Sequence, residues 1–309
     1  MKRFYDFCVA TDWAYDRDFV ELLEWIAFRK HRLETHVVDP ANLRETVDRY
    51  RDGSLSFDFL YDRASDSSPE FTELNVLAVQ DNVPLLDSIQ QLKWASDKAT
   101  MHLEFIAHGL IAPYTIIIPP YSKQASLHLV EKDLEKLGAF FVIKPANTTG
   151  GGIGVFENAA TLQDVFDVRR EFAADKYLLQ ERVKPVEKDG RRFWFRGFFC
   201  CGFVNCSWWD HALHVYELLT PSQVEMYGLG ELSNIVRKIA LIIKLNFFST
   251  EIALNEREQF VVIDYVNEVC DMRLKSKHAD GVPDQIVNRI AETIVDYVKD
   301  NKRVRTGSE

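Results

Sequence analysis

Two alternating hydrophobic patterns run through residues 1–90 of the chain. Short apolar runs typical of strands occupy residues 4–10, 34–38 and 56–61. Between them, residues 16–30 and 41–51 place apolar side chains three or four positions apart, as on one face of an amphipathic helix. Strands that alternate with helices in this way predict a parallel sheet covered by helices.

The rest of the chain mixes helical and strand-like patterns. Residues 97–108 predict a helix closed by Gly109, because glycine commonly follows the last residue of a helix. Further helices are predicted at 122–137, 161–174, 231–245 and 283–298. Strands are predicted at 114–118, 140–143, 153–156, 177–180, 193–199, 201–208 and 261–263. We expect three lobes, formed by residues 1–95, 96–183 and 184–309.

Composition narrows the classes of partner. The chain has 309 residues and a formal net charge of -10, which argues against a nucleic-acid partner. No apolar run reaches the ~20 residues that a membrane helix needs. Residues 1–6 lack the long apolar core of a signal peptide. We therefore expect a cytoplasmic protein that binds neither nucleic acid nor membrane.

Three of the five cysteines cluster near two histidines, which suggests a zinc site. The residues are Cys200, Cys201, Cys206, His211 and His214. Adjacent residues of a strand point to opposite faces, and the separation of Cys201 from Cys206 exceeds the usual gap between zinc ligands. We favour cysteines packed as small hydrophobic side chains over a zinc site.

A glycine-rich segment follows Lys144 in the middle of the chain. Consecutive glycines, here Gly150, Gly151 and Gly152, leave backbone N–H groups free to face phosphate oxygens. The segment is not a P-loop, and it lacks the third glycine of a dinucleotide fingerprint. It connects two predicted strands, so we interpret it as a β-hairpin tip that could cover a nucleotide, with Lys144 as a phosphate partner. A glycine turn without a ligand is the alternative.

Five segments, in order, resemble the ATP-grasp superfamily over roughly residues 95–275. They are Asp97-Lys98 with the helix that follows, residues 141–145 with the glycines, residues 178–183, Arg192 with the next two strands, and residues 261–267. The resemblance implies an α/β (α+β) chain with the ATP-grasp fold. The predicted N-terminal parallel sheet is similar to the open pre-ATP-grasp domain of such enzymes.

The resemblance also implies a nucleotide site. Lys98 and Lys144 would contact the phosphates of ATP beneath the glycine lid. The adenine and ribose would lie against four residues: Gln180, Glu181, Val183 and Glu187. Solvated side chains without a ligand are the alternative for Lys98 and Glu187.

The catalytic roles follow from the same resemblance. Arg192 would stabilise the transferring phosphoryl group together with Lys144, although the adjacent Arg191 is an alternative to Arg192. Arg273 would either reach the substrate or form an ion pair with Asp271.

Magnesium or manganese would be held by Glu251, Asp264 and Asn267. Glu251 and Asp264 each end an apolar strand, and pairing the strands brings together two acids that repel unless a cation separates them. Asn267 lies three residues after Asp264, so a regular strand would turn it away. We favour a bulge over replacement of Asn267 by Glu268 or Asp271.

These features predict an ATP-dependent carboxylate–amine ligase. ATP would activate a carboxylate as an acyl phosphate, and an amine or thiol would then displace phosphate, with ADP as the other product. A small-molecule kinase acting on a hydroxyl is the alternative. A nucleotide sensor without catalytic activity is less favoured, because the set of charged residues that catalysis needs is complete. The acidic composition favours a modestly charged substrate and hence the ligase.

The substrates themselves stay open. We expect small-molecule or peptide carboxylates and amines, and the sequence does not decide whether the protein forms a homodimer. Arg63, which follows the predicted strand at 56–61, could bind a carboxylate or a phosphate at the edge where ligands of open α/β sheets gather.

Overall fold

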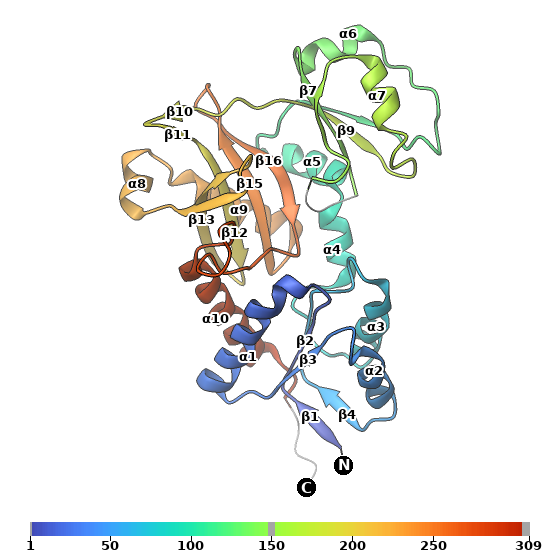
Figure 1. The fold of residues 1–309 in the computed structure, drawn as a ribbon, viewed down its shortest axis with the longest axis vertical. Coiled ribbons are helices and arrows are strands. Elements are labelled where there is room, and N and C mark those ends of the chain that lie inside the picture. The colour runs from blue at the N-terminus through green and yellow to red at the C-terminus, as the bar shows by residue number, and fades with distance from the viewer. Residues whose placement is uncertain (1, 148–151, 305–309) are drawn as a thin grey trace.

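A computed structural model describes residues 2–147 and 152–304 of the chain. Three sheet-containing lobes are visible in Figure 1: one built from the N-terminal residues, one from the middle of the chain and one from the C-terminal part. No helix among the described residues is long and apolar enough to cross a membrane.

The N-terminal lobe contains a parallel sheet in the order β3 (Thr35–Val38), β2 (Phe7–Ala10), β5 (Leu60–Asp62). Its helices are α1 (Arg17–His31), α2 (Leu43–Arg51) and α3 (Thr72–Gln80). Every residue of β2 is at most 1% exposed, as expected for a parallel strand covered on both faces. The predicted parallel sheet is confirmed. The predicted strand 4–10 is divided, because β1 (Arg3–Tyr5) pairs instead with β4 (Leu55–Phe57).

The middle lobe follows helices α4 (Ile89–Ser96) and α5 (Lys98–Ala107). The Asp97 side chain caps α5 by accepting the N–H of Thr100, and Gly109 follows the helix with φ of 72°. The antiparallel sheet runs in the order β6 (Thr115–Ile118), β9 (Tyr177–Glu181), β7 (Phe141–Pro145), β8 (Phe156–Ala159). The β7–β8 pair confirms the predicted hairpin around the glycines, although its second strand begins later than residue 153.

Most of the helix predicted at 122–137 is absent. Only α6 (Glu131–Leu134) and the 3-10 turn Glu135–Leu137 are helical. The buried guanidinium of Arg169, just after α7 (Leu162–Val168), donates to the carbonyls of Pro119, Gln124 and Ala125 at 2.9, 2.7 and 3.3 Å. These carbonyls are satisfied by a distant side chain, so the segment does not need helical hydrogen bonds.

The C-terminal lobe is an antiparallel sheet with helices on both faces. Its order is β14 (Val215–Leu218), β13 (Phe203–Asp210), β12 (Trp194–Cys200), β15 (Phe247–Leu254), β16 (Phe260–Asn267). The short hairpin β10 (Glu187–Lys188) and β11 (Arg191–Arg192) precedes it, and α8 (Pro221–Met226) follows β14. One face packs on α9 (Glu231–Ile243) and the other faces α10 (Asp284–Asn301). Gly197 permits the close approach of α9, since a Cβ there would lie 2.4 Å from Cγ2 of Val236.

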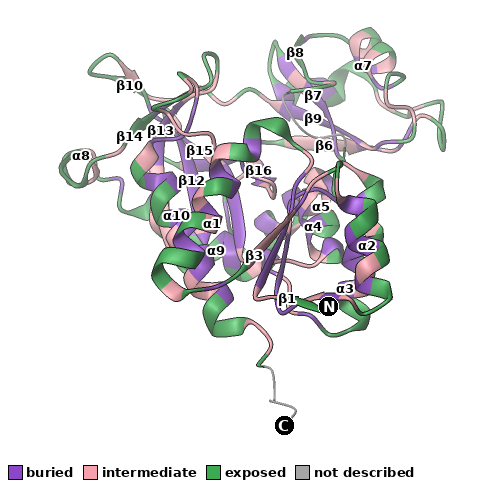
Figure 2. Cartoon of the chain, turned by 60° about the horizontal axis from the view of Figure 1, so that its bottom comes forward, coloured by how far each residue is buried: buried purple, intermediate pink, exposed green. Residues whose placement is uncertain are grey.

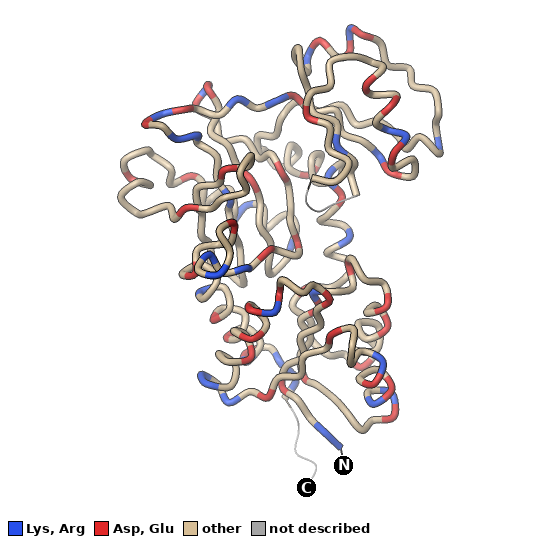
Figure 3. Tube along the Cα trace, in the orientation of Figure 1, with Lys and Arg blue, Asp and Glu red and all other residues tan. Residues whose placement is uncertain are grey.

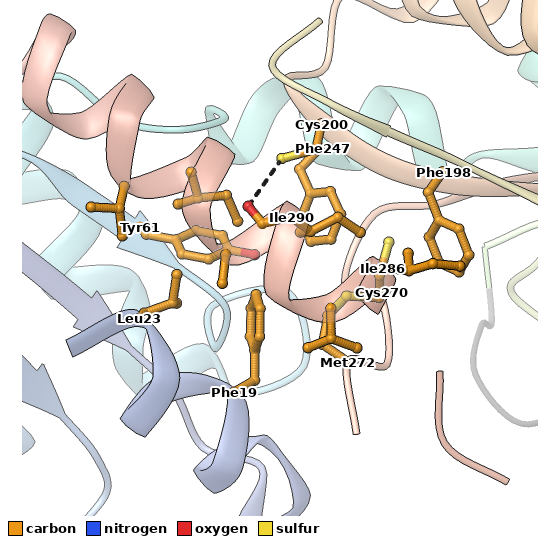
Figure 4. Close-up of a cluster of buried hydrophobic side chains, with 14 of the residues drawn as sticks. Phe19, Leu23, Tyr61, Phe198, Cys200, Phe247, Cys270, Met272, Ile286 and Ile290 are labelled. Carbon is orange, nitrogen blue, oxygen red and sulfur yellow. Dashed lines mark hydrogen bonds between the residues drawn. The ribbon is translucent and has the colours of Figure 1, made fainter. Parts of the chain in front are cut away.

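A shared core fixes the C-terminal sheet against the N-terminal lobe. Figure 4 shows Phe19 of α1, Phe198 of β12, Phe247 of β15 and Ile286 of α10 in one buried cluster. In Figure 2 the strands β12 and β15 of this sheet are largely buried, whereas the outer faces of the helices are exposed. Nη2 of Arg63, the residue directly after β5, donates to the carbonyl of Cys270, so the carboxyl end of β5 lies close to the segment that follows β16. The lobe boundaries at residues 95 and 183 stay a prediction.

Candidate functional site

The two candidate metal acids lie side by side on the C-terminal sheet. Glu251 of β15 is paired with Asp264 of β16, and Ser249 is paired with Asn267. Two residue steps along β15 thus correspond to three along β16, which is a β-bulge. The bulge turns Asn267 back toward Asp264, whose Oδ2 accepts a hydrogen bond from Nδ2 of Asn267 at 3.1 Å. The predicted bulge is confirmed, and the metal role of the three residues stays a prediction.

A second irregularity in β16 connects the acids with Lys144. The register of β15 and β16 also shifts between Glu251 and Ile252, which leaves Ile263 as an extra residue of β16. The carbonyl of Ile263 accepts a hydrogen bond from Nζ of Lys144 at 3.2 Å. Lys144 is buried, and burial lowers the pKa of its ammonium to about 8, while Asp264 acts in the opposite direction. Lys144 therefore bridges the middle and C-terminal sheets beside the acid pair.

Asp264 is surrounded by cations. Burial opposes its ionisation, but Lys98, Lys144 and Arg196 together hold the pKa of its carboxyl below the ordinary value. Lys98 is the first residue of α5, and its backbone N–H donates to the carbonyl of Ala146 at 3.0 Å. The structure thus brings both predicted phosphate-binding lysines to the acid pair.

Arg196 is a residue that our sequence analysis did not select. Its Nη2 lies 2.8 Å from Oε1 of Glu251, and Nε1 of Trp194 donates to Oε2 of the same carboxylate at 2.9 Å. Both partners come from β12, which pairs with β15. Burial opposes the charge of Arg196, yet Glu251 raises its pKa above the ordinary value. The available signal was a single charged residue within the apolar strand predicted at 193–199.

Arg192 occupies a different environment from Arg196. It lies on the exposed β10–β11 hairpin, where its Nε donates to Oε1 of Glu187 at 3.0 Å. The adjacent Arg191 pairs with Glu217 at 2.7 Å. The hairpin carries both charge signs, as Figure 3 shows, and the two predicted residues Arg192 and Glu187 satisfy each other. Their predicted roles at the nucleotide are not tested by these contacts.

The side chains of Gln180 and Glu181, which are predicted to line the adenine, form hydrogen bonds within the protein. Nε2 of Gln180 donates to the hydroxyls of Tyr265 and Thr115, at 2.8 and 3.1 Å. Oε1 of Glu181 accepts the N–H of Tyr114 at 2.8 Å, and Val183 is half-buried. Gln180 thus connects β9 to β16, next to the acid pair.

Two further arginines, Arg273 and Arg63, form ion pairs with carboxylates of the protein itself. Arg273 pairs with Asp271 and Asp280 at 2.7 and 2.9 Å, which is the ion-pair alternative of the sequence analysis. Arg63 is buried, and two of its nitrogens donate to Asp16 at 2.7 and 2.6 Å. It also donates to the Tyr61 hydroxyl and the Cys270 carbonyl, so it connects the lobes, and its predicted role at a substrate stays a prediction.

The cysteines near residue 200 lie on both faces of the C-terminal sheet. Sγ of Cys200 donates to the Ile290 carbonyl of α10 at 3.8 Å, whereas Cys206 lies on the α9 side beside Gly197. Within residues 2–147 and 152–304, no group of three or more His, Cys, Asp or Glu side chains is placed to hold a metal ion. Gly150 and Gly151 lie outside the described residues, and Gly152 has φ of 75°.

Comparison with solved structures identifies the fold. No protein-family model and no curated protein sequence matches the chain. An ATP-grasp RimK domain protein from Sphaerobacter thermophilus DSM 20745 matches with a TM-score of 0.63 and 16% identity, over 94% of this chain and 98% of that one. D-alanine–D-alanine ligase from Bacillus anthracis, complexed with ATP, matches with a TM-score of 0.64 and 13% identity, over 96% and 97%. The chain has the ATP-grasp fold.

A third match is the ATP-grasp ligase PsnB, complexed with a minimal precursor, Mg and ADP. It has a TM-score of 0.59 and 12% identity, over 96% of this chain and 97% of that one. All three similarities extend over nearly the whole chain, so they include the N-terminal lobe with its parallel sheet. The candidate site lies where β7 of the middle lobe meets β16 of the C-terminal lobe.

Proposed function

We propose that the chain is an ATP- and magnesium-dependent ligase that joins a carboxylate to an amine. The observation that carries the proposal is the bulged strand β16, which gathers Asp264, Asn267 and Glu251 next to Lys144. Acids flanked by buried cations are an arrangement suited to a divalent metal and a triphosphate. Structural neighbours described as ligases, one of them with Mg and ADP, support this chemistry.

The donor set fits magnesium. Glu251, Asp264 and Asn267 offer hard oxygen atoms, which Mg²⁺ prefers. Arg196 and Trp194 each use one acceptor position of Glu251, and a carboxylate has about four such positions, so positions stay free for a metal. Bound magnesium would neutralise and orient the phosphates of ATP.

The proposed reaction has two steps. A carboxylate oxygen attacks the γ-phosphorus of ATP, the bond to the β,γ-bridging oxygen breaks, and ADP leaves. The amine nitrogen then attacks the acyl carbon, the carbon–oxygen bond to phosphate breaks, and the nitrogen loses a proton as the amide forms. The protein supplies positioning and charge. Lys98 and Lys144 would neutralise the phosphates, and Arg196 would contribute a positive charge beside Glu251.

The residues predicted around the nucleotide complete the proposal. The backbone of Val183 and the side chains of Gln180 and Glu181 would line the adenine, with Glu187 near the ribose. Arg192 would reach the phosphates if its hairpin bends toward β16. Lysines and arginines alternate with acids over all three lobes in Figure 3, which favours a modestly charged acid over a polyphosphate acceptor.

A product screen tests the function. The protein is incubated with ATP, magnesium and pools of carboxylic acids and amines, and new masses are sought. With the active acid but no amine, hydroxylamine should trap a hydroxamate while ADP and phosphate accumulate. A stable phosphorylated hydroxyl compound without trappable acyl group would identify a kinase instead, and AMP would identify a different ligase mechanism.

A further inference from the structure

Two large aromatic side chains are exposed on the outer face of α1. Trp25 is 60% exposed and Phe28 is 54% exposed, whereas the inner face of the same helix, which includes Phe19 and Leu23, is buried in the shared core. Single apolar residues are common on protein surfaces, but neighbouring large ones usually mark an interaction site. Residues 25 and 28 are three positions apart, so they are neighbours on the helix surface. They therefore form an apolar patch that no other segment of the described chain covers.

Helix α1 presents this patch on a fixed support. One flank of the helix packs against α10, where Oδ2 of Asp296 lies 2.8 Å from Nζ of Lys30 and Oδ1 lies 2.6 Å from Nε2 of His31. Figure 1 shows α1 and α10 next to each other at one side of the N-terminal lobe. The patch is thus held in one orientation before a partner arrives, which lowers the entropic cost of binding.

The patch continues into charged residues of opposite sign. Four exposed residues of α1 and its C-cap are separated by four, three and four positions, which is the spacing of the contact seam between two packed helices: Glu21, Trp25, Phe28 and Arg32. In sequence order the seam is an acid, two aromatic residues and a base. If a second copy of α1 lies antiparallel across it, with residues 26 and 27 at the centre, Glu21 meets Arg32 of the second copy. Trp25 likewise meets Phe28 of the second copy, and each contact occurs twice, so the seam is complementary to itself.

Two arginines have donor groups available for this pairing. The guanidinium carbon of Arg32 lies 5.2 Å from the centroid of the Phe28 ring, and that of Arg29 lies 5.8 Å from the Trp25 centroid. A guanidinium over a ring uses its flat face, which leaves its N–H edge free for a carboxylate. Within residues 2–147 and 152–304, neither arginine forms an ion pair with a carboxylate. Both can therefore bind acids of another molecule.

The acidic half of α1 complements the two arginines. Glu21 accepts a hydrogen bond from Nε of the exposed Arg17 at 2.8 Å and keeps further acceptor positions. Burial raises the pKa of Glu24, and Glu21 acts in the same direction, so an added cation would favour the charged form of both acids. The helix dipole by itself accounts for acids near the start of a helix and bases near its end, but not for two exposed aromatic residues between them.

We infer that the outer face of α1 docks against the same face of a second copy of this chain, in an antiparallel pair with two-fold symmetry. A membrane surface is disfavoured, because anionic lipids attract basic faces and half of this face is acidic. A helix of 15 residues is only ~22 Å long. One contact of this length buries less than the ~1,600 Å² of a stable complex, so the pair is reversible and depends on protein concentration. The inference is independent of the proposed ligase function.

Sedimentation velocity measured over a wide range of protein concentration tests the pairing. The average mass of the wild type should rise from that of one chain toward that of two. Trp25→Gln should raise the Kd of the pair at least ~10-fold, because two aromatic contacts are lost while a good helix former stays at the position. Leu241→Gln is the matched control, because Leu241 of α9 is 79% exposed, and this change should leave the Kd as it is.

A charge swap tests the antiparallel register. Glu21→Arg alone and Arg32→Glu alone each create two contacts between like charges, so each should raise the Kd at least ~10-fold. The two changes together restore opposite charges only if residue 21 meets residue 32 of the second copy, and the Kd should then return to within ~3-fold of the wild type. Both positions are exposed, and circular dichroism with thermal unfolding checks that every variant is folded.

The inference is overturned if the wild type keeps the mass of one chain at every concentration, or if Trp25→Gln associates as tightly as the wild type. Failure of the combined variant to recover association overturns it as well, since residues 21 and 32 would then not meet. Loss of association in Leu241→Gln would place the interface on α9 instead. Sedimentation of a monomeric wild type with anionic phospholipid vesicles, but not of Trp25→Gln, would identify a lipid surface as the occupant.

Discussion

Asn267 and Asp264 are hydrogen-bonded to each other although they lie three residues apart in one strand, with 3.1 Å between Nδ2 and Oδ2. In a regular strand residues with this separation point to opposite faces. The extra residue in β16 reverses the direction of Asn267, and the register with Glu251 is retained. Three potential oxygen ligands are thereby gathered by a backbone irregularity, which makes the bulge itself a part of the candidate site.

Asp264→Asn should abolish most of the turnover and leave the fold intact. The amide retains an acceptor oxygen for Asn267 but lacks the negative charge that a dication needs. By analogy with removal of one preorganised electrostatic group, we expect the barrier to rise by at least ~2.7–4 kcal/mol. The measurement is the initial rate with the acid and amine found by the screen. Asp167→Asn, an exposed change on α7, is the control, and near-normal turnover in Asp264→Asn would remove Asp264 from the ligand set.

His102 should make the protein sensitive to mild acid. Burial and the nearby Lys144 lower the pKa of His102 to about 4, and Nδ1 lies 2.7 Å from the Tyr265 hydroxyl. The unfolded chain binds a proton near pH 6.5 and the folded protein does not, so stability is lost as the pH falls from 6.5 toward 4. Between pH 7 and pH 5 the loss amounts to ~2 kcal/mol.

Urea unfolding at the two pH values, compared between the wild type and His102→Gln, measures this effect. The glutamine variant should be less stable at pH 7, because the contact with Tyr265 is altered, but should lose less stability on acidification. An equal loss in both proteins would assign the acid sensitivity to other groups.

Gly197→Ala should destabilise the C-terminal lobe through overpacking. The added Cβ would lie 2.4 Å from Cγ2 of Val236, within the contact between β12 and α9. We expect a loss of about 1–3 kcal/mol in the free energy of unfolding. Val236→Ala combined with Gly197→Ala should recover part of the loss. Gly190→Ala meets no atom within 4 Å and tests the backbone effect of a glycine with positive φ alone.

Arg63→Met should destabilise the junction between the lobes. The change leaves Asp16 as a buried carboxylate without its cation, which costs ~3–5 kcal/mol. Replacing both residues, as in Arg63→Met with Asp16→Leu, should be less harmful than Arg63→Met alone. Arg17→Met, which removes an exposed pair with Glu21, is the control and should change stability little.

Periodicity predicted the elements whose structure depends on neighbouring residues. The parallel N-terminal sheet and the hairpin around the glycines follow from local patterns, whereas the bulge before Asn267 was expected because the resemblance implied Asn267 as a ligand. The structure confirms all three features. These features are decided by apolar spacing, glycine content and the facing rule of strands, all of which can be seen within a few residues.

Features that depend on distant partners could not be predicted in the same way. The segment before α6 is not helical because Arg169 binds its carbonyls from 44 to 50 residues away. Arg196 meets Glu251 across 55 residues because β12 pairs with β15, whereas the sequence drew attention to Arg192 through its resemblance to a motif. In both cases a guanidinium finds its acceptors only after the chain has folded.

The packing of α10 against α1 has a consequence for the order of folding during synthesis. Asp296 of α10 contacts Lys30 and His31 of α1, which lie 266 and 265 positions earlier in the sequence. The cluster that contains Phe19 and Leu23 therefore cannot be completed until α10 has left the ribosome. Contacts of such large sequence separation form slowly. The nascent N-terminal lobe is thus expected to expose one side of α1 until α10 has been synthesised and has emerged.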